Sequence, residues 1–258
     1  MQSNAVHPPI VVLITCHNRA EKTLACLNAL AKNERIFDVY LVDDGSTDDT
    51  RERVLSQYPD VMVLPGNGQL FWGGGMRLAF AMAMQKRYEY YLWLNDDTLL
   101  EFDALKRLVH THQDLAWNGY PLAIVAGSVK DPVTGHQTYG GRAKSHRWYS
   151  FKFQAVVPKV QPCLEDTMQG NIVLIPQSVV DKIGNIDAAF PHSLGDLDYE
   201  LRAGQVGCSV WIAPGYLGTC PQITCVGKLG RYLFADCRSI KKSDSNQRLP
   251  HKSLDDLS

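Results

Sequence analysis

Two carboxylates and an amide stand in a row at the end of a short apolar segment. Residues 90–94 have the continuous hydrophobic character of a strand buried on both faces, and Asn95, Asp96 and Asp97 follow directly. The carboxyl end of a parallel strand lies at the rim where open α/β sheets bind ligands, and Mg²⁺ and Mn²⁺ prefer oxygen ligands. The pattern therefore indicates a rim site that binds a cation. The alternative is a polar turn that caps the next helix.

A second acidic pair, Asp43 and Asp44, ends the apolar segment at residues 39–42. Carboxylates in this position accept hydrogen bonds from ribose hydroxyls or base N–H groups in nucleotide-binding folds. Two adjacent acids repel each other and neither is needed to form the turn, so we expect both to contact a ligand. Ser46, by contrast, is expected to cap the following helix.

The first apolar segment, residues 10–15, ends in a polar group that contains Thr15, His17, Asn18 and Arg19. The backbone here and the Arg19 side chain can meet a base or a phosphate. An entry into the next helix with Asn18 as its cap is equally favoured. Both interpretations stay open at the level of the sequence.

A glycine-rich segment around Trp72 offers a second place for the phosphates. Asn67 and Gly68 precede it, and a helix that begins near Gly75 would present free N–H groups and a positive dipole end, with Arg77 as a matching fork. No Gly-Lys-Ser/Thr sequence follows, so this is not a P-loop. The alternative is that some of these glycines only allow the loop to pack.

A third acidic cluster opens a helix near residue 195. Asp198 and Arg202 are four residues apart and are expected to pair on one helix face. That leaves Asp196 as the freer carboxylate, in the first turn, where it suits a general base. His192 lies three residues before Gly195 and is expected to contact the acceptor or the metal.

Alternating strands and helices must position these groups. Strands are expected at residues 10–15, 39–42, 61–64, 90–94, 122–128, 171–175 and 210–213. Helices are expected around residues 24–30, from 46 onward, and at 73–86, 102–109, 178–183 and 195–203. The first four strands alternate with helices, which predicts a doubly wound, mostly parallel α/β sheet, and the second half is mixed. Residues 138–153 favour either a hairpin or a loop.

The bulk composition excludes some partners. The 258 residues carry a formal net charge of −1, which gives no field for nucleic acid. Seven scattered cysteines without a C-x-x-C pair predict reduced thiols in a cytoplasmic protein, and residues 1–9 lack a secretory pattern. Seven Lys or Arg against two Asp between residues 226 and 252 predict a solvated tail, or contact with anionic lipid at the inner face of the membrane.

The order of the motifs resembles a family-2 inverting glycosyltransferase of the GT-A fold. Residues 11–19 and 42–48 resemble the nucleotide-binding half of that family, residues 94–97 its Asp-x-Asp metal motif, and residues 195–203 its Glu-Asp-x-Asp-hydrophobic-x-x-Arg segment. Each motif is moderately specific. Together they span residues 10–215, most of the chain.

The resemblance implies a reaction and a role for each cluster. Asp44 would contact the nucleoside, with Asp43 beside it, and Asp97 would bind Mg²⁺ or Mn²⁺ at the donor diphosphate. Asp196 would deprotonate the acceptor hydroxyl, so that a sugar passes with inversion from a nucleotide-diphospho-sugar to a saccharide or lipid-linked acceptor. Bacterial surface polysaccharide synthesis is the expected setting.

Three departures from the family pattern point to a specialised member. Gly195 replaces the usual Glu, and Asn95 replaces the first Asp, a change associated with rhamnosyltransferase-like members. Residues 70–75 replace an Asn-x-Gly pattern, so the donor-sugar pocket is expected to be unusual. Trp72 would stack there on the sugar or base, or lie buried under the loop.

We expect one GT-A domain over residues 1–225, with a nucleotide-binding half at about 8–98, an acceptor half at about 99–225, and a basic tail at 226–258. Two other functions fit a similar sheet. A sugar-phosphate nucleotidyltransferase would need a Gly-rich basic loop after the first strand, which residues 15–19 lack. A non-catalytic nucleotide-sugar-binding module would keep the fold without the transfer.

Overall fold

The computed structural model describes residues 9–34, 36–144, 153–165 and 167–221. These all lie in one compact unit, Met1–Pro221. The basic tail expected at 226–258 lies outside the described residues. No helix among the described residues is long and apolar enough to cross a membrane.

The first half is a parallel sheet with one helix in each crossover. The elements run β1 (Ile10–Cys16), α1 (Ala20–Ala31), β2 (Phe37–Asp43), α2 (Thr50–Gln57), β3 (Met62–Pro65), α3 (Phe71–Met84) and β4 (Tyr90–Leu94). The strands lie in the order β3-β2-β1-β4, all parallel. The expected doubly wound arrangement is therefore confirmed, and the ends of these strands meet at one rim.

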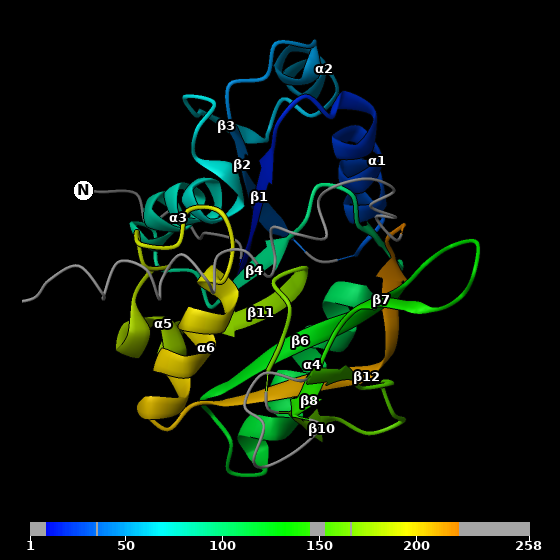
Figure 1. Cartoon of the computed structure of the whole chain (residues 1–258), viewed down its shortest axis with the longest axis vertical. Coiled ribbons are helices and arrows are strands. Elements are labelled where there is room, and N and C mark those ends of the chain that lie inside the picture. Colours follow the sequence, from blue (N-terminus) through cyan, green and yellow to red (C-terminus); the bar gives the residue numbers. More distant parts are fainter. Residues whose placement is uncertain (1–8, 35, 145–152, 166, 222–258) are drawn as a thin grey trace, which may run out of the picture. The chain divides into compact units, whose positions relative to one another are not determined.

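The second half extends the same sheet with mixed directions (Figure 1). Its elements are β5 (Leu99–Leu100), α4 (Ala104–Trp117), β6 (Ala123–Lys130), β7 (Gln137–Tyr139), β8 (Arg142–Lys144), β9 (Phe153–Ala155), β10 (Cys163–Leu164), β11 (Ile172–Pro176), α5 (Gln177–Ile183), α6 (Gly195–Gln205) and β12 (Ser209–Thr219). Strand β11 runs antiparallel between β4 and β6, and β12 runs parallel to β6. The β8–β9 pair forms a small antiparallel sheet of its own, as one of the two interpretations of this region expected.

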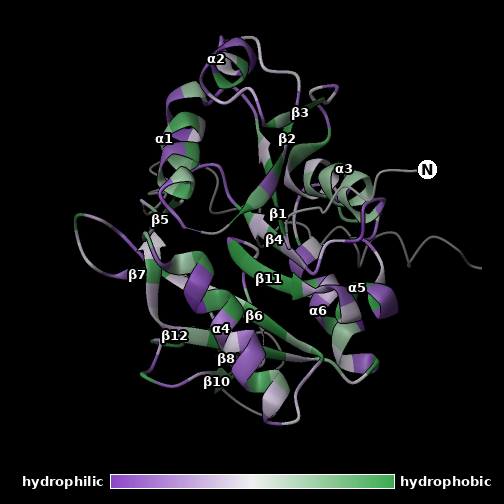
Figure 2. Cartoon of the chain, turned by 180° about the vertical axis from the view of Figure 1, so that it is seen from behind, coloured by the Kyte–Doolittle hydropathy of each residue, from purple (hydrophilic) through white to green (hydrophobic). Residues whose placement is uncertain are grey.

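Alternate residues of the strands feed two cores, one on each face of the sheet. Ile10, Val12 and Ile14 of β1 pack with side chains of α1 and α4, whereas Val11 and Leu13 pack with α3, α5 and α6. Figure 2 shows the central strands largely in the hydrophobic colour, as burial on both faces requires. This two-sided packing fixes where each strand ends, and so fixes the rim.

Several expected boundaries are wrong, among them the end of α4, which continues to Trp117 instead of ending near residue 109. Helix α2 begins at Thr50 instead of near Ser46, because residues 46–49 form the loop that meets the β1 end. Helix α3 begins at Phe71, two residues before the expected start. Strand β12 continues to Thr219, well beyond residue 213, because its pairing with β6 passes Pro214 and Gly215 through a register shift.

Candidate active site

The acids that follow β4 are buried and share one cation. Asp96 and Asp97 are only 4% and 7% exposed. Arg19, at the start of α1, reaches both, with Nη1 at 3.0 Å from Asp96 Oδ1 and Nη2 at 2.5 Å from Asp97 Oδ2. Two charge-assisted contacts from one guanidinium are among the stronger polar interactions in a protein. Arg19 therefore neutralises part of the charge of the acidic pair.

Burial shapes the titration of this pair. Desolvation and, to a lesser extent, the neighbouring Asp97 raise the pKa of Asp96 to about 6, against the lowering effect of Arg19. Burial lowers the pKa of Arg19, but Asp96 and Asp97 outweigh this and raise it above its ordinary value. Asp96 Oδ2 is buried and accepts no hydrogen bond of good geometry among the described residues, although the neighbouring Thr23 hydroxyl lowers the pKa of Asp96 slightly.

A cysteine that the sequence analysis did not select holds the other side of Asp97. Cys220 follows β12, is fully buried, and its Sγ–H donates to Asp97 Oδ1 across 3.4 Å. Burial and the Asp97 carboxylate raise the pKa of the Cys220 thiol to about 12, so it stays a neutral donor. The two partners are 123 positions apart in the sequence, so no local pattern could indicate this contact.

Asp44 anchors the glycine segment through three backbone groups. Its Oδ1 accepts the N–H of Gly68 at 2.8 Å, and its Oδ2 accepts the N–H groups of Leu70 and Phe71 at 2.9 Å each. Asp43 Oδ1 accepts the N–H of Ser46 at 3.1 Å. The premise that neither acid is needed for its turn is therefore wrong. A contact of either carboxylate with a ligand stays a prediction.

The loop after β1 is bonded to the loop after β2. Asn18 Oδ1 accepts the N–H of Thr47 at 2.7 Å, and the Asn18 N–H donates to Ser46 Oγ at 2.9 Å. His17 Nδ1 donates to the Asp44 carbonyl oxygen at 2.6 Å. The side chain of Asn18 therefore does not cap α1, whose N-cap position is Arg19 and has no side-chain cap. The cap predicted for Ser46 is also wrong.

Asp196 is connected to the end of β4 through residues 170 and 171, although 99 positions separate it from Asp97 in the sequence. Its Oδ2 accepts the N–H of Gly170 at 2.9 Å. The next residue, Asn171, accepts the N–H of Asn95 on its carbonyl oxygen at 3.0 Å. One bond from a backbone N–H to the Asp196 carboxylate and one bond between backbone groups therefore link the helix start that carries Asp196 to the strand end that carries the acidic pair.

Trp72 fills the space between these two groups. Its Nε1–H donates to Asn95 Oδ1 at 2.9 Å. On the other side the indole packs so closely on Gly170 that a Cβ there would lie 2.6 Å from Trp72 Cζ2, and Gly195 lies against the same ring. The indole is half-buried, so it is both a packing element and part of the site wall.

The other residues of the glycine-rich segment pack against β1 or form hydrogen bonds with neighbouring loops. Gly75 lies against Thr15, where a Cβ would come within 2.2 Å of the Thr15 hydroxyl oxygen. Arg77 Nε donates to the Ile186 carbonyl oxygen at 3.1 Å, which ties α3 to the loop before α6. Asn67 Oδ1 accepts a local N–H from Gln69. Phosphate contacts of Arg77 and Asn67 stay predictions.

The expected free helix end at Gly75 is absent among the described residues. The helix begins earlier, the N–H groups of Leu70 and Phe71 belong to Asp44, and those of Gly73 and Gly74 reach the Pro191 carbonyl oxygen at 2.7 and 3.2 Å. A phosphate site built on this helix start is therefore wrong as stated.

The acceptor-side residues divide in two. Asp198 Oδ2 accepts Arg202 Nε at 2.8 Å, so the expected ion pair is confirmed. His192 is exposed and its ring lies 3.7 Å, centroid to centroid, from Phe71. Asp196 is less free than expected, since its Oδ1 also accepts the Leu197 N–H at 2.9 Å. Contact of His192 with an acceptor stays a prediction.

Replacing Gly170 by alanine tests the Trp72 packing. The new Cβ would overlap the indole, so the Trp72–Asn95 hydrogen bond should break and the free energy of unfolding should fall by about 1–3 kcal/mol. Gly204→Ala is the matched control, because a Cβ at Gly204 in α6 meets nothing within 4 Å. Urea unfolding of both variants checks this, and equal stabilities would contradict the packing argument.

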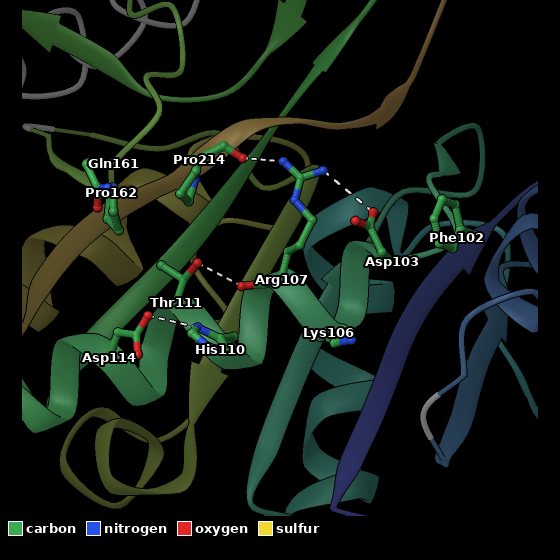
Figure 3. Close-up of a pocket in the computed structure, with 10 residues that line it drawn as sticks. All are labelled: Phe102, Asp103, Lys106, Arg107, His110, Thr111, Asp114, Gln161, Pro162 and Pro214. Carbon is green, nitrogen blue, oxygen red and sulfur yellow. Dashed lines mark hydrogen bonds and ion pairs between the residues drawn. The ribbon is translucent and has the colours of Figure 1, made fainter.

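A cavity of about 410 Å³ lies apart from this site along α4 (Figure 3). Charged side chains line much of it, among them Asp103, Lys106 and Arg107. Arg107 Nη1 also donates to the Tyr216 carbonyl oxygen at 3.0 Å, which fixes α4 to β12. None of the predicted site residues lines this cavity.

The residue types at the acidic pair suit a divalent cation, although their present partners do not leave them free. Among the described residues, no group of three or more His, Cys, Asp or Glu side chains is arranged to hold a metal ion. The buried Asp96 Oδ2 and the hard carboxylate oxygens fit Mg²⁺ or Mn²⁺. The contacts with the Arg19 guanidinium show that the two carboxylates attract positive charge.

Comparison with known proteins identifies the family. Residues 11–184 match Glycosyl transferase family 2, and the chain therefore belongs to that family. The matched range includes both acidic pairs and ends before α6, so Asp196 lies outside it. A search of curated proteins found no match.

Solved structures share the GT-A fold. TarS 1-349 of S. aureus aligns over 93% of this chain and 66% of its own, with a TM-score of 0.57 and 15% identity. The mannosyltransferase PcManGT of Pyrobaculum calidifontis, in complex with GDP-Man and Mn²⁺, aligns over 95% and 67%, with 0.56 and 16%. GalNAc-T7 with UDP, GalNAc and Mn²⁺ aligns over 98% and 53%, with 0.64 and 15%. The chain thus spans about half to two thirds of these relatives.

Proposed function

We propose that this chain transfers a sugar from a nucleotide-diphospho-sugar to a hydroxyl of a saccharide or lipid-linked acceptor, with inversion at the anomeric carbon. The observation that carries the proposal is a pair of hydrogen bonds: the Gly170 N–H donates to the Asp196 carboxylate, and the Asn95 N–H donates to the Asn171 carbonyl oxygen. They connect Asp196, the carboxylate that we propose as the general base, to the strand end that is followed by Asp96 and Asp97. Family membership supports glycosyl transfer over nucleotidyl transfer.

Each cluster has a part in one displacement. Asp196 takes the proton of the acceptor hydroxyl as its oxygen attacks the anomeric carbon. The bond from that carbon to the diphosphate oxygen breaks, and the nucleoside diphosphate leaves from the opposite face. Residues at the β1 and β2 ends, including Asp43, bind and orient the nucleoside. Trp72 and Asn95 close the sugar side of the site and exclude water.

A divalent cation belongs to the proposal as the partner of the diphosphate. Asp97, with Asp96, would hold Mg²⁺ or Mn²⁺, which when bound neutralises charge on the departing group. Two of the similar structures contain Mn²⁺. Their low identity limits this to support by likeness of fold.

The finer assignments follow from the departures at the site. We propose a hexose or a deoxyhexose such as rhamnose as the transferred sugar, because Asn95 replaces the first Asp of the family motif, a change associated with rhamnosyltransferase-like members. Bacterial surface polysaccharide synthesis in the cytoplasm is the proposed setting. Residues 1–225 would form the transferase domain, with the division near residue 98, and the basic tail at 226–258 would touch the inner face of the membrane.

Thermal shift with nucleoside diphosphates tests the proposal. A screen of UDP, GDP and dTDP with and without Mn²⁺ should find one that stabilises the protein only or mainly with metal, because a ligand that binds the folded state raises its stability. At about 100 times its Kd the ligand should add about 2.7 kcal/mol and raise the Tm by roughly 5–10 °C. ATP serves as the control, and no response to any diphosphate in Mn²⁺ contradicts the proposal.

A further inference from the structure

Arg19 covers the carboxylates that a divalent cation would need. The Arg19 side chain is 32% exposed, whereas the side chains of Asp96 and Asp97 are 5% and 7% exposed. The guanidinium therefore lies on the solvent side of the pair. Cys220 closes the inner side of Asp97.

Few oxygens of the pair are left for a metal. Asp96 Oδ1 and Asp97 Oδ2 contact Arg19, and Asp97 Oδ1 accepts from Cys220. Only Asp96 Oδ2 accepts no hydrogen bond of good geometry among the described residues, and it is buried. The neighbouring amide oxygen of Asn95 accepts from Trp72. A cation that prefers several oxygens can bind here only after Arg19 moves.

The balance of charges also indicates that Arg19 must move before a divalent cation binds. With Arg19 in place, a bound divalent cation would put three positive charges, one from the guanidinium and two from the metal, against the two negative charges of the Asp96 and Asp97 carboxylates. Like charges held close in a partly buried site repel strongly. A diphosphate supplies the missing negative charge. It also offers the guanidinium fork an anion of matching geometry.

We propose that Arg19 is the resident counter-ion of this site and that it exchanges partners when the donor binds. The guanidinium leaves the Asp96 and Asp97 carboxylates for the diphosphate, and the oxygens it vacates accept the divalent cation. Metal and nucleoside diphosphate then bind with positive cooperativity, each raising the affinity for the other by the same factor. This rests on the proposed function, which supplies the diphosphate.

Mn²⁺ titration of the nucleotide-free protein, followed by electron paramagnetic resonance, tests the competition directly. Arg19→Met should bind Mn²⁺ about tenfold more tightly than the unmodified chain, because the competing cation is gone. Lys22→Met is the matched control. Lys22 is exposed on the same helix and lowers the pKa of Asp96 through its charge, but forms no ion pair with the described residues. Its removal should change Mn²⁺ affinity less than about twofold.

The cooperativity gives a second readout. In the unmodified chain, the nucleoside diphosphate that gave the largest thermal shift should tighten Mn²⁺ binding about tenfold, and this gain should shrink in Arg19→Met. If Arg19→Met does not fold, Arg19→Gln removes the charge but keeps a polar side chain, and it should tighten Mn²⁺ binding in the same direction.

Each outcome decides one question. An Mn²⁺ affinity in Arg19→Met that equals or falls below that of the unmodified chain overturns the Arg19 proposal, even if nucleotides bind. So does an equal gain in the Lys22→Met control. A chain that binds no nucleoside diphosphate contradicts the proposed function instead, and tighter Mn²⁺ binding by Arg19→Met would still support the counter-ion role.

Discussion

Replacing Asp196 by asparagine is expected to lower the rate of sugar transfer about 10²–10⁴-fold, the range typical of a lost general base. The amide oxygen can still accept the Gly170 N–H, and the variant gives up only the bond that Oδ1 accepts from the adjacent Leu197 N–H, so the link to Gly170 should be kept. The amide cannot take a proton from the acceptor hydroxyl, however. Binding of the nucleoside diphosphate should therefore be unchanged while turnover falls.

Asp187→Asn provides the control for this experiment. Asp187 is an exposed carboxylate in the loop before α6, and it accepts only a local N–H from Ala189. Its amide variant should keep full transfer activity. Turnover that is equal in the two variants would remove Asp196 from the mechanism. An unmodified chain that binds the donor but transfers nothing would favour the non-catalytic binding module.

Replacing Asp44 by asparagine should have the largest effect on stability. The carboxylate is 4% exposed and accepts three backbone N–H groups. In the variant an NH₂ group replaces one oxygen, so at least one buried donor faces another donor. We expect the free energy of unfolding to fall by about 2–4 kcal/mol, since each buried unsatisfied group costs about 1–3 kcal/mol. Guanidinium unfolding without nucleotide measures this.

Asp49→Asn is the matched variant for the Asp44 experiment. Asp49 precedes α2 in the same loop, makes no side-chain cap, and its side chain is 65% exposed. Surface changes of this kind usually stay within about 0.5 kcal/mol. If the free energy of unfolding of Asp44→Asn falls by less than about 1 kcal/mol, the three hydrogen bonds of the Asp44 carboxylate contribute little to the stability of the fold.

The parallel half of the fold could be predicted because its signals are local. The strand expected at residues 90–94 is β4, with the same bounds, since five apolar residues in a row are dictated by burial on both faces. Met76, Ala79 and Phe80 stand at helical spacing within the helix expected at residues 73–86, and all three are fully buried in α3. Periods of 3.6 residues and short apolar runs are enough for elements of this kind.

The site was less predictable because its contacts are long-range. Arg19 meets Asp97 across 78 positions, and Gly170 meets Asp196 across 26. The types of these residues suggested ligands, but only the fold shows which polar group is already paired. Asp44 is the clearest case. The local sequence around a buried acid is the same whether its carboxylate accepts backbone N–H groups or binds a nucleoside, so the sequence does not distinguish the two roles.

The carbonyl oxygen of Pro191 has a mechanical consequence. It accepts the N–H groups of Gly73 and Gly74, and the Phe190 carbonyl oxygen lies where a Cβ at Gly73 would be, 2.1 Å away. The segment that leads to Asp196 is thus hydrogen-bonded to, and closely packed on, the first turn of α3, which contains Trp72. A displacement of the loop at Phe190 and Pro191 must therefore also displace the first turn of α3. Under the proposed function, entry of the acceptor past this loop and rearrangement around the donor sugar beside Trp72 would be one coupled motion.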